Sequence, residues 1–244
     1  MVGRCRRAFG VLVVSSVFCS AGLGFAGLGS AGLGSAGFAT RADAATLPAP
    51  LRPAAAYAAR VHPIDAGIAA RIVGRSWRPG CPVALADLRY VTVRYWGFDG
   101  RVHLGELVVH VTAAGPVVTA FRRLFDARFP IARMVLVDVY DADDDRSTRA
   151  NNTSAFNCRP VTGGSRWSRH AYGLAIDINP VQNPYVYADG HVLDPAAAKY
   201  RDRSRRDPGM IHPGDVVVRA FAAIGWRWGG DFRTTKDYQH FDRP

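Results

Sequence analysis

The chain has 244 residues, 48% of them hydrophobic, and carries a formal net charge of +11 at pH 7. This length predicts one domain of about 150–180 residues with a real hydrophobic core, together with terminal and linking segments. Lys and Arg are scattered and no nucleic-acid recognition motif accompanies them, so we expect no nucleic-acid partner. Such a basic balance is typical of a protein that works beside an anionic polymer, for example a bacterial cell wall.

Residues 1–44 have the composition of a targeting segment. Basic residues at positions 4, 6 and 7 precede an apolar run at 8–19, a low-complexity Ala/Gly segment follows, and Ala42-Asp-Ala44 offers small residues for cleavage. This layout predicts a secretory signal peptide, and the alternative is an uncleaved N-terminal anchor. No later apolar run is long enough to cross a bilayer. We therefore expect a secreted or cell-envelope protein that meets the membrane only through this segment, if it stays uncleaved.

The next residues, 45–75, are rich in Ala, Pro and Arg and are predicted to be a linker with a short helix around 63–74. The folded domain is predicted at 76–244. Alternating β-branched and aromatic residues predict a strand at 88–96, and turn residues at 97–100 lead to a second strand at 106–111.

A helix is predicted at 115–127 from its i, i+3, i+4 apolar spacing, followed by a buried strand at 131–140. The acidic stretch at 141–164 is predicted to be a long functional loop. We then expect a strand at 172–178, a helix at 213–224, and short strands at 226–228 and 238–241. Helices and mostly antiparallel strands in this irregular order indicate an α+β fold, with a small central antiparallel sheet flanked by helices.

Two cysteines, Cys81 and Cys158, follow the N-terminal segment. In an oxidising compartment, two thiols of a small domain commonly pair. A bridge between them would contribute about 4 kcal/mol in the chain-entropy model. We therefore predict a disulfide, and the alternative is two independently buried thiols.

The most informative motif is Ser-x-His-x-x-Gly-x-Ala-x-Asp at 168–177, answered near the C-terminus by Asp-x-x-His at 237–240. His170, Asp177 and His240 supply two imidazoles and a carboxylate, the ligand set of a catalytic zinc site that keeps one position open. His170 and Asp177 lie too far apart for adjacent turns of one helix. We therefore expect a loop to deliver His170 and a strand to carry Asp177 back toward it. The motif predicts one Zn²⁺ per chain and a hydrolase.

Further residues have candidate roles around this site. Asp237 is the predicted general base, and the alternative is an acceptor that orients a ligand imidazole. Ser168 has two open roles, a hydrogen bond to a transition-state oxygen and bracing of its loop. Arg159 and Arg146 are candidates for binding a peptide carboxylate through a bidentate fork; the alternative for both is surface solubility.

These motifs resemble the zinc peptidase family that contains D-alanyl-D-alanine carboxypeptidases of the VanY type and L-alanyl-D-glutamate endopeptidases of phage endolysins. The resemblance covers roughly residues 77–242 and is strongest at 152–185. It implies an α+β fold with a central antiparallel sheet, one zinc, and hydrolysis of peptidoglycan stem peptides. It also implies that His170, Asp177 and His240 are the ligands and Asp237 the base.

The chain departs from the carboxypeptidase pattern near its end. Many relatives have Glu-x-x-His with Trp before the histidine, whereas this chain has Asp237-Tyr238-Gln239-His240. Asp at the base position is similar to the endolysin-type branch. D,D-carboxypeptidase and L,D-endopeptidase activity therefore both stay open.

An alternative from another functional class is a cell-wall binding module that keeps this fold and its zinc without cleaving, because one fold can host several functions. The intact general base favours an enzyme. A purely structural wall protein is a further alternative, which the complete set of ligands and base disfavours. We expect a monomer whose partners are peptidoglycan stem peptides.

Overall fold

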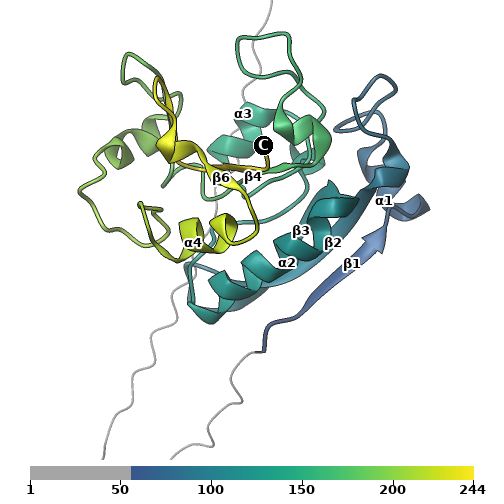
Figure 1. Ribbon diagram of the computed structural model, residues 1–244, viewed down its shortest axis with the longest axis horizontal. Helices are drawn as coiled ribbons and strands as arrows, with labels where there is room; N and C mark the ends of the chain where they lie inside the picture. The colour runs from purple at the N-terminus through teal and green to yellow at the C-terminus, as the bar shows by residue number, and fades with distance from the viewer. Residues whose placement is uncertain (1–55) are drawn as a thin grey trace, which may run out of the picture. The chain divides into compact units, whose positions relative to one another are not determined.

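The computed structural model describes residues 56–244 (Figure 1). The predicted signal segment at 1–44 and the beginning of the predicted linker lie outside the described residues. The first sheet consists of β1 (Ala59–Pro63), β2 (Leu88–Trp96) and β3 (Val102–His110), in the order β1-β2-β3 with antiparallel pairs. Helix α2 (Val111–Asp126) follows β3 directly and packs against β2. The strand predicted at 88–96 and the helix predicted at 115–127 are therefore confirmed, although the helix begins earlier.

The predicted linker of residues 45–75 extends too far, because residues 59–72 belong to the folded domain. β1 pairs with β2 along its whole length, and α1 (Ala66–Ile72) begins after Asp65, whose carboxylate accepts a hydrogen bond from the backbone N–H of Ile68. Arg71 of α1 donates two 2.8 Å hydrogen bonds to Glu106 of β3. β1 is an edge strand with mostly exposed side chains, so it lacks the apolar alternation that would have revealed it.

The second half of the domain contains two small antiparallel sheets instead of one central sheet. One has the order β4-β8-β6 and consists of β4 (Ala175–Asp177), β8 (His240–Asp242) and β6 (Arg227–Trp228); the other pairs β5 (Tyr185–Val186) with β7 (Lys236–Asp237). Helix α3 (Asp144–Arg149) interrupts the predicted loop at 141–164. Helix α4 (Val216–Ala222) packs against α2, as Figure 1 shows. Mixed helices and small antiparallel sheets agree with the α+β class.

The strand predicted at 131–140 is wrong, because these residues are irregular and end in a 3₁₀ helix at Val137–Tyr140. Buried asparagine side chains replace the missing strand partners. Asn179 accepts a hydrogen bond from the backbone N–H of Ala132, and Asn152 accepts one from that of Val135 and donates one to its carbonyl. Buried backbone polar groups must be paired, and side-chain amides meet that need here without a sheet.

The core joins the two halves of the domain. Apolar side chains of the first sheet and α2 meet those of α4 and the second sheet; its fully buried members include Val91, Leu107, Phe121, Phe221 and Phe241. The rings of Phe221 and Phe241 stack at a centroid distance of 4.5 Å. Because α4 and β8 share this contact, the strand that carries His240 rests on the common core.

The predicted disulfide between Cys81 and Cys158 is confirmed, with Cα atoms 5.8 Å apart. It ties the segment before Arg159 to the chain beyond α1. Cys158 is buried, and its backbone N–H donates to the carbonyl of Ser76. Within the part of the chain that the structure describes, no helix combines the length and apolar character that crossing a bilayer requires.

Candidate active site

His170 lies in a short 3₁₀ helix, Arg169–Tyr172, that is fixed at both ends. At its start the Ser168 hydroxyl accepts a 3.3 Å hydrogen bond from the backbone N–H of His170. At its end Gly173 adopts a left-handed conformation with φ of 66°, and a Cβ there would lie 2.5 Å from the backbone nitrogen of His110. That nitrogen donates to the Gly173 carbonyl at 2.9 Å. The close backbone approach requires glycine and anchors the His170 turn on the first sheet.

Asp177 and His240 come together because their strands are neighbours. β4 and β8 pair antiparallel in a register that sets Asp177 opposite His240. The predicted strand at 172–178 therefore carries Asp177 as expected, but it is shorter because the 3₁₀ helix occupies its beginning. The sheet and the capped turn place all three candidate ligands around one point.

The donor atoms of these residues fit a zinc ion. His170 Nε2 lies 3.2 Å from His240 Nδ1 and 3.1 Å from Asp177 Oδ2, and His240 Nδ1 lies 2.9 Å from Asp177 Oδ1. A tetrahedral Zn²⁺ with bonds of about 2.05 Å separates its ligand atoms by about 3.3 Å. His170 Nδ1 donates to the carbonyl of Ala155 at 2.5 Å, which leaves the Nε2 lone pair directed at the cluster. The residues therefore fit the metal that the sequence predicts.

The electrostatics of this group match a cation site. Burial of Asp177 opposes its ionisation, but His170 and His240 outweigh this effect and hold the pKa of Asp177 well below its usual range. Burial alone would lower the pKa of His240; the hydrogen bond to Asp177 and the nearby carboxylates raise it to about 9. Without metal, the proton on His240 compensates the negative charge of the buried Asp177 carboxylate. A bound cation would replace this proton and compensate the same charge.

Asp237 faces the same cavity from β7. The residue is partly exposed, but its Oδ1 is buried and has no hydrogen-bond partner among residues 56–244. Burial raises the pKa of Asp237 to about 6, and His240 partly opposes this shift. Gly229 packs against the turn that joins Asp237 to His240, because a Cβ there would lie 2.5 Å from the Asp237 carbonyl oxygen. A carboxyl with this pKa can exchange a proton near neutral pH.

The cavity around these groups has a volume of about 560 Å³. Arg159 lines it, and its Nη2 lies 2.7 Å from Asp144 Oδ2. Ser168 also lines it while capping the His170 turn. Arg146 does not line it; its exposed guanidinium lies 2.7 Å from Asp141 beside its own helix. The expectation that Arg146 faces the substrate is therefore not supported by its position.

Several residues that line the cavity were missed from the sequence. Arg227 donates to the buried carboxylate of Asp242 at 2.7 and 3.2 Å, and this pair braces β6 against β8. Tyr185 supplies aromatic surface. Gln239, between Asp237 and His240, is only 7% exposed and its Oε1 has no partner within the described residues. The position of Gln239 inside the Asp-x-x-His motif was the one feature of the sequence that could have indicated its place in the site.

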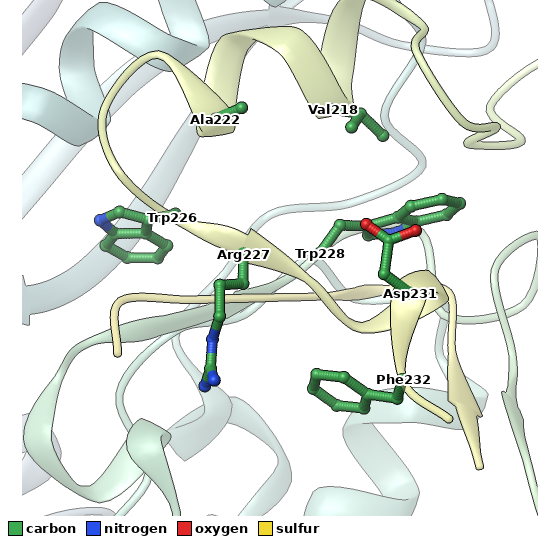
Figure 2. A pocket seen from close by; sticks show the side chains of 7 residues that line it. All are labelled: Val218, Ala222, Trp226, Arg227, Trp228, Asp231 and Phe232. Atoms are coloured by element: carbon green, nitrogen blue, oxygen red, sulfur yellow. The ribbon is translucent and has the colours of Figure 1, made fainter. Parts of the chain in front are cut away.

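A second, smaller hollow of about 380 Å³ shares Arg227 and Phe232 with this cavity. Figure 2 shows Val218 and Ala222 of α4 on one side of it and the residues of the β6 region on the other. Its lining contains one carboxylate, that of Asp231, and no histidine. The groups suited to metal chemistry therefore lie in the larger cavity.

Comparison with known proteins adds a similarity to one family over part of the chain. Residues 162–243 match the family model described as D-alanyl-D-alanine carboxypeptidase. Comparisons with curated proteins and with solved structures gave no match. Over the matched residues, which hold the three candidate ligands and Asp237, the chain is similar to the zinc D-alanyl-D-alanine carboxypeptidase family, as its motifs predicted.

Proposed function

We propose that the chain is a secreted zinc metallopeptidase that hydrolyses peptide bonds of peptidoglycan stem peptides. One observation carries the proposal: two imidazoles and a carboxylate meet in a cavity of about 560 Å³, beside a buried carboxyl oxygen that has no partner among the described residues. The family match supports the peptidase class, and the resemblance of the motifs supports stem peptides as the substrate.

In this proposal His170 Nε2, His240 Nδ1 and the Asp177 carboxylate hold the metal. When bound there, zinc supplies a Lewis acid for the scissile carbonyl and lowers the pKa of an attacking water. Asp237 takes the proton from that water and passes it to the leaving amine, a contribution of about 10²–10⁴-fold. The burial that raises its pKa to about 6 suits both transfers.

Arg159 and Ser168 are the proposed substrate-binding groups. The pairing of Arg159 with Asp144 holds its guanidinium at the cavity wall, where it can donate to a carbonyl or carboxylate of the peptide. The Ser168 hydroxyl accepts from the His170 N–H, and this leaves its own proton available to donate. Bracing the loop and binding a transition-state oxygen are therefore compatible roles.

An extracytoplasmic location is part of the proposal. A disulfide such as Cys81–Cys158 is typical of proteins that fold in an oxidising compartment. The predicted signal segment would deliver the chain there. A wall polymer would then be within reach of the basic protein.

The decisive experiment is incubation of the purified protein with peptidoglycan, followed by mass spectrometry of the released peptides. We expect products that disappear with a chelator and return with added zinc. Defined stem peptides then separate loss of terminal D-Ala from internal cleavage. Zinc-dependent binding to peptidoglycan without any product would instead support the wall-binding module.

A further inference from the structure

Buried polar atoms without a hydrogen-bond partner can indicate where a ligand binds. Among residues 56–244, three buried side-chain atoms lack a hydrogen-bond partner: Arg159 Nε, Asp237 Oδ1 and Gln239 Oε1. All three residues line the cavity that holds the candidate zinc ligands. Most buried polar atoms in native proteins are paired, so each exception calls for an explanation. Their coincidence in one cavity points to groups of the substrate.

Gln239 is the member of this set with no role yet. The residue is 7% exposed. Its backbone carbonyl accepts a 3.0 Å hydrogen bond from the N–H of Ile178, which fixes the residue beside β4. The residue lies between Asp237 and the candidate ligand His240 in the chain, and all three residues line the same cavity. An amide oxygen accepts and does not donate, so the buried Oε1 calls for a donor that the described residues do not supply.

We propose that Gln239 is a substrate-binding residue whose Oε1 accepts a hydrogen bond from the N–H of the scissile amide. The inference rests on the proposed peptidase function and deepens it. As general base, Asp237 must reach the leaving nitrogen in order to protonate it. Gln239 follows Asp237 by two residues, lines the same cavity and carries an unpaired acceptor among the described residues, so we assign that acceptor to the N–H of this nitrogen.

In the proposed hydrolysis, Gln239 only accepts a hydrogen bond and takes part in no bond change. The water oxygen forms a bond to the scissile carbonyl carbon and its proton moves to Asp237. The C–N bond then breaks as Asp237 passes the proton to the leaving nitrogen, while Gln239 transfers nothing. Its neutral carbonyl holds the N–H and so directs the nitrogen lone pair toward the incoming proton. This hydrogen bond strengthens as the nitrogen gains the proton, which makes it selective for the transition state.

The test compares Gln239→Met on an amide peptide and on the matching ester, which lacks the N–H. We expect kcat/KM on the amide to fall by about tenfold, the effect of one hydrogen bond, and kcat/KM on the ester to change less than about twofold. The matched control is Gln182→Met. Gln182 is also buried, but its Oε1 accepts a 2.8 Å hydrogen bond from Asn151 and it does not line the cavity. This variant should keep the wild-type values on both substrates.

A second variant, Gln239→Glu, retains an acceptor oxygen. Repulsion from Asp237 should slow it on both substrates, but its amide-to-ester ratio of kcat/KM should stay that of the wild type. Zinc content and thermal unfolding check that each variant is folded. Equal losses on amide and ester, or no loss on the amide, would overturn the role of Gln239. Absence of cleavage by the wild type would instead refute the proposed function.

Discussion

Gly229→Ala should damage the candidate site although it replaces none of the candidate ligands. A Cβ at this position would lie 2.5 Å from the Asp237 carbonyl oxygen, 2.9 Å from the Asp237 Cβ and 3.2 Å from the His240 Cβ. The nearest atom belongs to the backbone, so no side-chain rotation relieves the clash. The turn that joins the base to the last ligand would have to move by about 0.9 Å to restore ordinary contact.

The expected cost follows from that displacement. Overpacking of this kind lowers the free energy of unfolding by about 1–3 kcal/mol. A misplacement near 1 Å in catalytic geometry costs up to about 100-fold in rate. We therefore expect Gly229→Ala to remain folded, to bind zinc more weakly, and to lose about 10–100-fold in kcat/KM on a stem peptide. Chemical denaturation, zinc titration and peptide kinetics measure the three quantities.

The control for this prediction is Gly115→Ala in α2. Apart from its chain neighbours, a Cβ at Gly115 meets nothing within 4 Å among the described residues, and this exposed position does not line the cavity. This variant should keep wild-type zinc affinity and kinetics. If Gly229→Ala also kept both, the reasoning that the close packing of this glycine fixes the site would be refuted.

Three further predictions follow from the geometry and charge of the domain. Reduction of the Cys81–Cys158 bridge should lower the free energy of unfolding by about 4 kcal/mol, measured by denaturant titration with and without reductant; an unchanged midpoint would contradict it. The two Arg71 hydrogen bonds hold the pKa of Glu106 below its usual range. Their contribution to the free energy of unfolding is therefore present above the pKa that Glu106 has in the unfolded chain. It is lost as pH falls through the lower pKa of Glu106 in the folded protein. Glu106→Gln should therefore lower the free energy of unfolding by about 1 kcal/mol at pH 7. The difference in this free energy between variant and wild type should become smaller toward pH 3. A difference that does not change with pH would argue against a stabilising Arg71–Glu106 pair. Because His240 has a pKa of about 9 without metal, zinc binding at pH 7.5 should release about one proton. Calorimetry in several buffers measures this number as the slope of the observed binding enthalpy against the ionisation enthalpy of the buffer. A slope near one in magnitude is expected, and a slope near zero would contradict the prediction.

The sequence predicts those parts of the fold whose signals are local. The strand at 88–96 and helix α2 are found because their apolar residues repeat with the period of a buried face. The candidate ligands are found because few patterns other than a metal site combine histidines, a carboxylate and small residues at such spacing. The structure adds how Asp177 and His240 meet, through the β4–β8 register.

The parts that sequence reasoning misses depend on distant partners. β1 is an exposed edge strand, so its pairing with β2 leaves no apolar pattern. Ile131, Met134 and Leu136 are buried as residues of a strand would be. Asn152 and Asn179 from elsewhere in the chain nevertheless pair with the backbone here. Such contacts become visible only once the chain is folded.

The central claim is that His170, Asp177 and His240 hold the zinc while Asp237 makes it catalytic. Zinc content and stem-peptide turnover, measured together on His170→Ala and Asp237→Ala, test it most directly. We predict that His170→Ala loses both the metal and the activity, whereas Asp237→Ala keeps one equivalent of zinc and loses turnover by at least about 100-fold. Full turnover by zinc-loaded Asp237→Ala, or undiminished zinc binding by His170→Ala, would contradict the account.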